Sequence, residues 1–219
     1  MSICGDMSMM ARAFVRSALI VLVLAASPGS GAAPEDNAAP NGGEPAEAVF
    51  AGGCFWCTES DFDSVPGVIS TTSGYTGGKV RNPTYEQVSA GNTGHIESVR
   101  VVYDPARVDY AALVERLLRT IDPIDARGQF CDRGDQYRSA IFVANPREEQ
   151  IARAVIAKLT PQKKVSGEIA TLVLARAQFY PAEDYHQDYY KKNPLKYRFY
   201  RRNCGRDARV KQAWGEAAH

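Results

Sequence analysis

The sequence predicts an α/β protein in which strands and helices alternate along the chain and pack as a sandwich. Its 219 residues are 45% hydrophobic and 23% charged, close to the averages for soluble globular proteins. Short apolar segments typical of strands alternate with segments whose apolar residues recur at helical spacing. About 170 residues follow residue 47, the usual size of one domain, and no internal repeat is evident.

The N-terminus has the layout of a secretory signal peptide. Arg12 and Arg16 precede an apolar run at 18–26, about half of the roughly 20 residues that span a bilayer, which disfavours a permanent anchor. Small and helix-breaking residues follow, so we expect a signal peptide at 1–32 with cleavage near Ala32 or Ala33. The mature chain is then periplasmic or secreted, without membrane insertion. Residues 33–47, rich in Pro, Ala, Asn, Gly and acid, predict a flexible linker.

Residues 48–219 form the predicted domain, and turn residues divide its first half. The expected elements, in order, are a buried strand at 48–51 that ends in two glycines, a helix at 54–65 closed by Pro66-Gly67, an extended segment at 68–75, and an alternating strand at 98–103.

The second half of the domain starts with a helix from Val108, whose apolar residues recur at helical spacing. A strand at 139–144 follows, then a helix at 146–159 with proline in its first turn, and a strand at 169–174. Beyond Phe179 the chain is rich in Tyr, Lys and Arg. We expect a long irregular C-terminal tail there, with one candidate helix at 182–192.

Charge and cysteine content narrow the function. Lys plus Arg is 26 against 25 for Asp plus Glu, so a nucleic-acid partner is not expected. Five cysteines are too few for a disulfide-held scaffold, and Cys4 would leave with the signal peptide. The other four, at 54, 57, 131 and 204, are better candidates for chemistry.

The segment Gly52-Gly53-Cys54-Phe55-Trp56-Cys57 carries the main candidate site. A strand that ends in two glycines and turns into a helix places Cys54 at the helix N-terminus, which favours a thiolate. Cys57, three residues later, can hydrogen-bond that thiolate and attack Cys54 once it is oxidised. These residues therefore predict a nucleophile with a neighbouring thiol.

Other interpretations of this cysteine pair stay open. It could be structural, or half of a zinc site, although Cys131 and Cys204 form no second close pair and His95 and His186 stand alone. A thioredoxin-like thiol-disulfide oxidoreductase is the stronger alternative, but its motif normally has Gly-Pro between the cysteines. A non-catalytic exported binding domain with an aromatic surface is a third class.

Six ordered motifs resemble the A-type peptide-methionine sulfoxide reductases, and they cover the whole predicted domain. They are Gly-Cys-Phe-Trp at 53–56, Ser-Gly-Tyr-Thr-Gly-Gly at 73–78, Asn-Pro-Thr-Tyr at 82–85, Gly-Asn-Thr-Gly-His-Ile-Glu-Ser-Val at 91–99, Asp-Arg-Gly-Asp-Gln-Tyr-Arg-Ser at 132–139, and Ala-Glu-Asp-Tyr-His-Gln at 182–187. The resemblance implies a two-layer sandwich of ferredoxin-like type. It also implies reduction of the S epimer of methionine sulfoxide, with no metal and no bound organic cofactor.

The resemblance also assigns roles in the reaction. Cys54 would attack the sulfoxide sulfur and become a sulfenic acid. Glu97 would protonate the sulfoxide oxygen, which requires a raised pKa near neutral pH. Tyr85 and Tyr137 would hydrogen-bond the oxygen, and Asp132 would orient that network.

Four further side chains are placed by the same motifs. Phe55 and Trp56 would form an apolar wall for the substrate's methyl group. We interpret His95 as a hydrogen-bonding residue of its turn, and His186 as structural. The partners implied are oxidised proteins and an external thioredoxin-like thiol donor, and we expect a monomer.

The chain departs from the family pattern at its other cysteines. Cys57 replaces a common glycine, Arg198 stands where a resolving cysteine often follows the preceding tyrosine, and the next cysteine is Cys204. Cys131 replaces a common asparagine, and we interpret it as a small, dispensable packing residue. We expect Cys57 to attack oxidised Cys54 first and Cys204 then to take over the disulfide.

Overall fold

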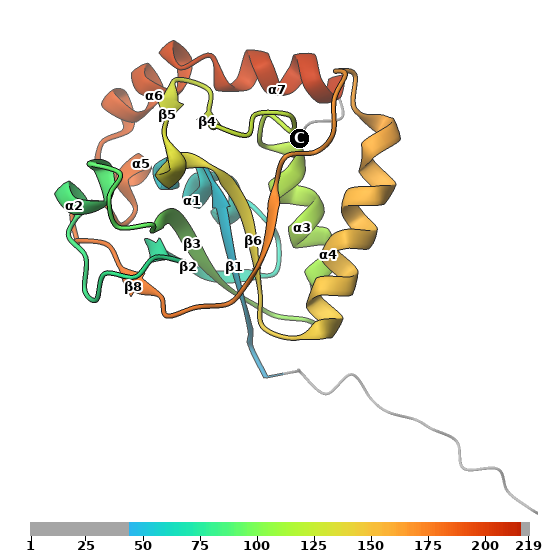
Figure 1. Cartoon of the computed structure of the whole chain (residues 1–219), viewed down its shortest axis with the longest axis horizontal. Helices are drawn as coiled ribbons and strands as arrows, with labels where there is room; N and C mark the ends of the chain where they lie inside the picture. The colour runs from blue at the N-terminus through green and yellow to red at the C-terminus, as the bar shows by residue number, and fades with distance from the viewer. Residues whose placement is uncertain (1–43, 216–219) are drawn as a thin grey trace, which may run out of the picture. The chain divides into compact units, whose positions relative to one another are not determined.

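The computed structural model describes residues 44–215, which contain a six-stranded mixed sheet (Figure 1). Its strands are β1 Ala46–Gly52, β2 Val68–Thr76, β3 Ile96–Tyr103, β6 Ser139–Val143, β7 Leu172–Ala175 and β8 Tyr180–Pro181. They lie in the order β7-β6-β1-β3-β2-β8, and all neighbours are antiparallel except β6 and β7. β4 Gly128–Gln129 and β5 Asp132–Arg133 form a separate hairpin. The predicted signal peptide lies outside the described residues.

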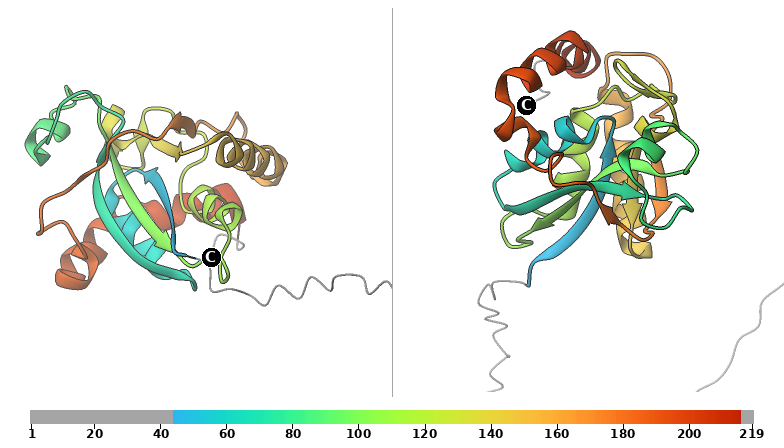
Figure 2. Two further views of the ribbon diagram at one scale, coloured as in Figure 1. Left: turned by 90° about the horizontal axis from the view of Figure 1, so that it is seen from below. Right: turned by 90° about the vertical axis from the view of Figure 1, so that its left-hand side faces the viewer.

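The described residues also form seven α-helices. They are α1 Phe55–Asp63, α2 Tyr85–Ser89, α3 Tyr110–Arg119, α4 Pro146–Leu159, α5 Tyr189–Lys192, α6 Pro194–Asn203 and α7 Arg206–Trp214, with short 3₁₀ helices at Asp135–Tyr137 and Thr160–Gln162. Figure 1 and the right-hand view of Figure 2 place α6 and α7 beyond the strand end where β1 finishes and α1 begins. In the described part of the chain, no helix has the length and apolar character needed to cross a membrane.

Alternation along the strands builds a core on each face of the sheet. On one face Phe50 stacks against Phe62 of α1, with ring centroids 5.0 Å apart, and the apolar stripe of α3 and part of α4 complete the cluster. On the other face Val49 and Phe142 pack with Leu172 and Phe179. The predicted α/β class, a central sheet packed with helices, is therefore confirmed.

Most element boundaries agree with the sequence analysis, and the differences have local causes. β1 begins at Ala46, within the predicted linker, because Ala46 pairs with Tyr103 and Glu47 with Val102 of β3. The helix α2 was not predicted. Its signal is a capping box, in which the Thr84 hydroxyl accepts from the Gln87 N–H and the Gln87 side chain accepts from the Thr84 N–H.

The prediction of a long irregular C-terminal tail is wrong, because residues 189–214 form α5, α6 and α7. The candidate helix at 182–192 is α-helical only from Tyr189. Side chains distant in sequence hold these helices: Arg201 donates to Asp61 at 2.8 Å, and Arg209 donates to Asp122 at 2.7 Å. Ion pairs between residues so far apart in the sequence give no periodic apolar pattern in the C-terminal segment, so its helices could not be predicted from such a pattern.

Candidate active site

A pocket of about 70 Å³ lies where β1 ends and α1 begins. Its lining contains all seven residues that were predicted to act as nucleophile, acid, hydrogen-bond donors, orienting carboxylate or apolar wall, together with one residue that was not predicted. The lining residues are Cys54, Phe55, Trp56, Tyr85, Glu97, Asp132, Tyr137 and Tyr200. Segments from five parts of the chain thus converge on one small volume.

Backbone geometry at the end of β1 aims Cys54 into this pocket. Gly53 has φ +86°, and a Cβ there would lie 2.5 Å from the Cβ of Gln129, so only glycine fits the turn. Cys54 is the N-cap of α1, and its carbonyl accepts from the N–H groups of Cys57 and Thr58 at 3.1 and 3.2 Å. The Cys54 side chain is 6% exposed.

Burial reverses the protonation expected for Cys54. It raises the pKa of the Cys54 thiol well above its ordinary value, and its hydrogen bond with Cys57 and the nearby charge of Glu97 raise it further. The helix N-terminus therefore does not make Cys54 a resting thiolate. The pKa of Cys57 is instead lowered, by the same hydrogen bond and by the guanidinium groups of Arg206 and Arg201.

Glu97 has the protonation state predicted for a general acid. It is the second residue of β3, is 2% exposed, and its Oε2 accepts the N–H of Phe55 at 3.1 Å. Burial raises the pKa of Glu97 to about 8, aided by the charge of Asp132 and opposed by the Phe55 hydrogen bond. A carboxyl with this pKa is mostly protonated at neutral pH, as the role of general acid requires.

Tyr85 and Tyr137 present protonated hydroxyls to the pocket. Burial and the charge of Glu97 raise the pKa of Tyr85 to about 12, and the same two causes raise that of Tyr137. The start of α2 is held in place because the Tyr85 N–H donates to Glu183 at 2.9 Å, while the Tyr75 hydroxyl donates to the other oxygen of Glu183 at 2.8 Å. Because their pKa values are raised, the hydroxyls of Tyr85 and Tyr137 stay protonated and can donate hydrogen bonds into the pocket.

Asp132 is hydrogen-bonded to a residue that sequence analysis missed. The hydroxyl of Tyr200, a residue of α6, donates to Oδ2 of Asp132 at 2.5 Å. Burial raises the pKa of Asp132, and this hydrogen bond and the charge of Arg206 oppose the shift. Tyr200 was one of many tyrosines in a tail expected to be irregular, so no sequence signal singled it out.

Aromatic packing fixes the remaining wall of the pocket. The indole N–H of Trp56 donates to Nδ1 of His186 at 3.0 Å, and its ring stacks on Tyr189 with centroids 3.7 Å apart. Phe55 is buried and tilts against His186.

His95 accepts from the Gly78 N–H at 3.1 Å and contacts the Val80 carbonyl, as expected for a residue of its turn.

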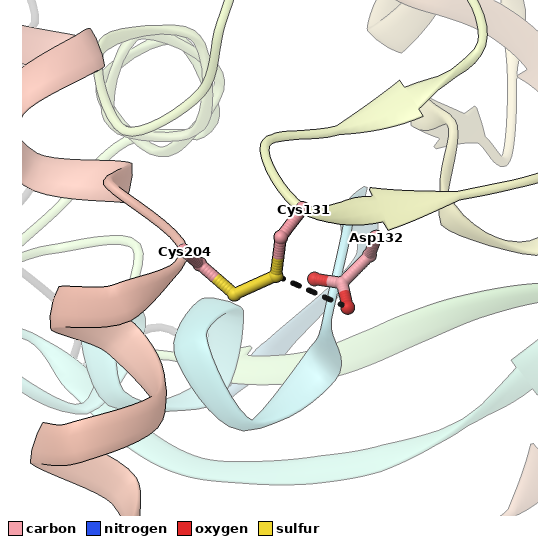
Figure 3. A group of neighbouring side chains, drawn as sticks. All are labelled: Cys131, Asp132 and Cys204. Atoms are coloured by element: carbon pink, nitrogen blue, oxygen red, sulfur yellow. Dashed lines mark hydrogen bonds between the residues drawn. A yellow bond between two sulfur atoms is a disulfide. The ribbon is translucent and has the colours of Figure 1, made fainter.

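The cysteines pair differently from the expectation. Cys131 is bonded to Cys204 in a disulfide, with Cα atoms 4.9 Å apart, so Cys131 is no mere packing residue (Figure 3). Their separation of 73 residues concealed this pairing. Asp132 lies beside the bridge, but sulfurs bonded to each other offer no thiolate to a metal. Cys54 and Cys57 are buried free thiols, and the recycling roles of Cys57 and Cys204 stay predictions.

The fold and this pocket define a cysteine-centred redox site with an adjacent protonated carboxyl. The family model for peptide methionine sulfoxide reductase matches residues 46–218. MsrA 2 of Rhizobium meliloti is 53% identical over 176 residues, covering 80% of this chain and 87% of that protein. MsrA 2 of Caulobacter vibrioides is 50% identical over 197 residues, covering 90% and 98%.

Solved structures give the same result. Methionine sulfoxide reductase A of Corynebacterium diphtheriae is 39% identical with a TM-score of 0.64, over 69% of this chain and 76% of that one. Reduced Mxr1 from Saccharomyces cerevisiae is 29% identical with a TM-score of 0.65, over 69% and 87%. The chain belongs to the peptide methionine sulfoxide reductase family.

Proposed function

We propose that this protein reduces methionine S-sulfoxide, in oxidised proteins and as the free amino acid, to methionine. The observation that carries the proposal is the meeting of a buried cysteine, Cys54, with a carboxyl whose pKa is raised to about 8, Glu97, in one pocket. A sulfoxide oxygen leaves sulfur readily only when it is protonated. The aromatic walls Phe55 and Trp56 suit the methyl group on the substrate's sulfur.

In the proposed first step, the sulfur of Cys54 attacks the sulfoxide sulfur while Glu97 protonates the sulfoxide oxygen. Tyr85 and Tyr137 donate hydrogen bonds to that oxygen. The bond between the two sulfurs forms as the S–O bond breaks, and the oxygen takes a second proton from the Cys54 thiol and leaves as water. A water then attacks the Cys54 sulfur and breaks the bond between the two sulfurs. Cys54 is left as a sulfenic acid, methionine leaves as the thioether, and the proton released by the water returns to Glu97. Cys54 loses two electrons and the substrate sulfur gains two, so the step needs no other reactant.

Recycling then uses the neighbouring thiol. The sulfur of Cys57 attacks the sulfenic acid, a Cys54–Cys57 disulfide forms, and water leaves. An external thioredoxin-like dithiol reduces this bond and is itself oxidised to a disulfide, and no cofactor stays bound. Cys204 can take part only after its bond to Cys131 has been reduced.

A chirally resolved assay tests the function. A peptide with S or R methionine sulfoxide is incubated with the protein and dithiothreitol, and the products are separated. We expect loss of the S epimer alone. The alternative, a thioredoxin-like thiol-disulfide oxidoreductase, draws on the lowered pKa of Cys57 beside Cys54. Reduction of insulin disulfides without formation of methionine would favour that alternative.

We also propose that the four central strands form a ferredoxin-like unit. Their order β6-β1-β3-β2, with antiparallel neighbours, supports this assignment. So do α1 and α3, each of which connects two strands that have one other strand between them.

We expect a monomer, which light scattering after size exclusion would test.

Export is a further proposal, supported by Arg12, Arg16 and the apolar run at 18–26. A cleaved signal peptide would place the mature protein in the periplasm or outside the cell. The test is N-terminal sequencing of the chain after cell fractionation. An uncleaved chain recovered with the cytoplasm would contradict it.

A further inference from the structure

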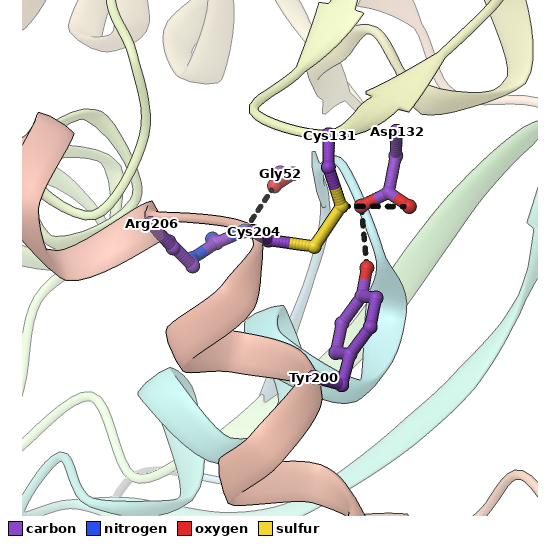
Figure 4. The surroundings of a disulfide bond; sticks show 6 residues. All are labelled: Gly52, Cys131, Asp132, Tyr200, Cys204 and Arg206. Atoms are coloured by element: carbon purple, nitrogen blue, oxygen red, sulfur yellow. Dashed lines mark hydrogen bonds between the residues drawn. A yellow bond between two sulfur atoms is a disulfide. The ribbon is translucent and has the colours of Figure 1, made fainter.

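Two links join α6 to the β4–β5 hairpin, and they run side by side (Figure 4). One is the disulfide between Cys131 and Cys204, and the other is the hydrogen bond from Tyr200 to Asp132. Cys131 and Asp132 are consecutive, while Cys204 follows Tyr200 by one helical turn and donates its N–H to the Tyr200 carbonyl at 2.9 Å. The disulfide therefore restrains the distance that the hydrogen bond must span.

Tyr200 also lines the pocket that contains Cys54. Its ring meets Trp56 edge-on, with centroids 5.7 Å apart. Burial raises the pKa of Tyr200, as do the charges of Cys54 and Asp132 and its hydrogen bonds to both. The phenol thus keeps its proton between the nucleophile and the carboxylate.

The turn after α6 is anchored on its other side by Arg206. This side chain is 2% exposed, donates to the Gly52 carbonyl at 3.1 Å, and lies over the Phe130 ring at 4.7 Å. Gly52 ends β1, and Phe130 immediately precedes Cys131. The turn at 204–206 therefore contacts both the strand that leads to the nucleophile and the hairpin that carries Asp132.

We propose that Tyr200 is a positioning residue that orients Asp132 and Cys54 for attack on the sulfoxide, and that the Cys131–Cys204 disulfide holds Tyr200 in place. The inference rests on the proposed function for the reaction it assists. It gives the disulfide a role in the first chemical step, separate from recycling. Loss of the bridge should therefore slow the formation of methionine even when no recycling is required.

The first experiment is a single turnover. Protein in which Cys54 is a free thiol receives one equivalent of an S-sulfoxide peptide. Samples are quenched at short intervals, and the methionine formed in each is measured. A net hydrogen bond contributes about 1 kcal/mol, so Tyr200→Phe should react about fivefold more slowly. The matched control is Tyr190→Phe, which removes a hydroxyl bonded to a carboxylate, Asp63, outside the pocket. It should react at the wild-type rate.

Variants of the bridge test the second half of the proposal. Cys131→Ser and Cys204→Ser should slow the single turnover to the same degree, by no more than Tyr200→Phe does. Cys131→Ser/Tyr200→Phe should be no slower than Tyr200→Phe alone, since both changes remove one interaction. Thermal melting checks folding, and Cys131→Ala/Cys204→Val replaces a serine variant that fails to fold.

A titration supplies a readout that general loss of structure would not move. Removing a hydrogen bond to a carboxylate raises its pKa, so NMR of ¹³C-carboxyl aspartate should show a higher pKa for Asp132 in Tyr200→Phe and Cys131→Ser. The value should stay unchanged in Tyr190→Phe. This measurement remains decisive even if the wild type reduces no sulfoxide, an outcome that would sink the proposed function alone.

Three results would overturn the inference as a whole, and a fourth would overturn the part that concerns the disulfide. The first three are a wild-type single-turnover rate for Tyr200→Phe, independent and multiplying effects of Cys131→Ser and Tyr200→Phe, and an unshifted Asp132 pKa in both variants. A Cys204→Ser protein slowed only in multiple turnovers would assign Cys204 to recycling and would likewise refute the positioning role of the bridge.

Discussion

The carboxylate of Glu97 accepts the backbone N–H of Phe55 at 3.1 Å, which seats it on the first turn of the helix that Cys54 opens. Two effects oppose each other there. The N–H donor favours the ionised carboxylate, and burial favours the neutral acid. The effect of burial is the larger of the two, and the pKa of Glu97 is therefore raised to about 8. The strand that carries Glu97 thus delivers a proton donor to the start of α1.

Replacing the nucleophile should abolish the reaction. Cys54→Ser keeps the size and burial of the side chain, but a hydroxyl does not attack sulfoxide sulfur, so no methionine should form. Chirally resolved peptide substrates with dithiothreitol provide the measurement. Tyr190→Phe, which leaves Cys54, Cys57 and the pocket intact, is the comparison. Survival of activity in Cys54→Ser would assign the attack to another residue.

Removing the acid should slow the same step. Glu97→Gln keeps the shape but delivers no proton, so we expect the single-turnover rate to fall roughly 10²–10⁴-fold. Glu59→Gln is a matched control, because Glu59 is also buried but lies outside the pocket. Burial raises the pKa of Glu59 to about 7. That variant should keep a rate near that of the wild type. An unchanged rate in Glu97→Gln would place the acid elsewhere.

The pKa of Glu97 also predicts how stability depends on pH. Between its ordinary value of 4.5 and about 8, the unfolded chain has released this proton and the folded protein retains it. The contribution of Glu97 to the free energy of unfolding therefore falls as pH rises through that window, by at most about 1.4 kcal/mol per pH unit. Urea unfolding across this range should show a steeper decline for the wild type than for Glu97→Gln. Parallel curves would contradict the raised pKa.

Recycling should depend on Cys57 more than on Cys204. Cys57 lies one turn from Cys54 with a lowered pKa, whereas Cys204 is held by Cys131. After one equivalent of sulfoxide, peptide mapping should find a Cys54–Cys57 disulfide in the wild type and a persistent sulfenic acid in Cys57→Ser. A Cys54–Cys204 bond formed in Cys57→Ser at the wild-type rate would make the tail the first resolver.

The buried ion pair that anchors α7 should carry much of the stability of the C-terminal helices. Arg206 and Asp61 are nearly inaccessible and lie 3.4 Å apart, so Arg206→Met leaves a buried carboxylate with less compensation. We expect a loss of about 3 kcal/mol in the free energy of unfolding. Arg153→Met, which removes an exposed pair with Glu149, should cost under about 1 kcal/mol. Equal effects of the two changes would contradict this.

Local patterns predicted five of the six strands of the central sheet and missed β8, whereas the family resemblance supplied most of the site. Apolar alternation and glycine turns located β1 and β3, and the helix at 146–159 is α4. The family motifs selected every lining residue of the pocket except Tyr200. These features are readable because each is written in neighbouring residues, as a period, a turn or a short motif.

By itself, the sequence determined the alternation of strands and helices and the candidate nucleophile Cys54, and its family motifs supplied the candidate acid Glu97. Only the tertiary structure decided that Cys131 pairs with Cys204, that Tyr200 bonds Asp132, and that the resting Cys54 is a protonated thiol. The reason is physical. Pairings between residues about 70 positions apart, and the loss of solvent that raises a pKa, arise from packing that brings distant segments together, and no short stretch of sequence encodes that packing.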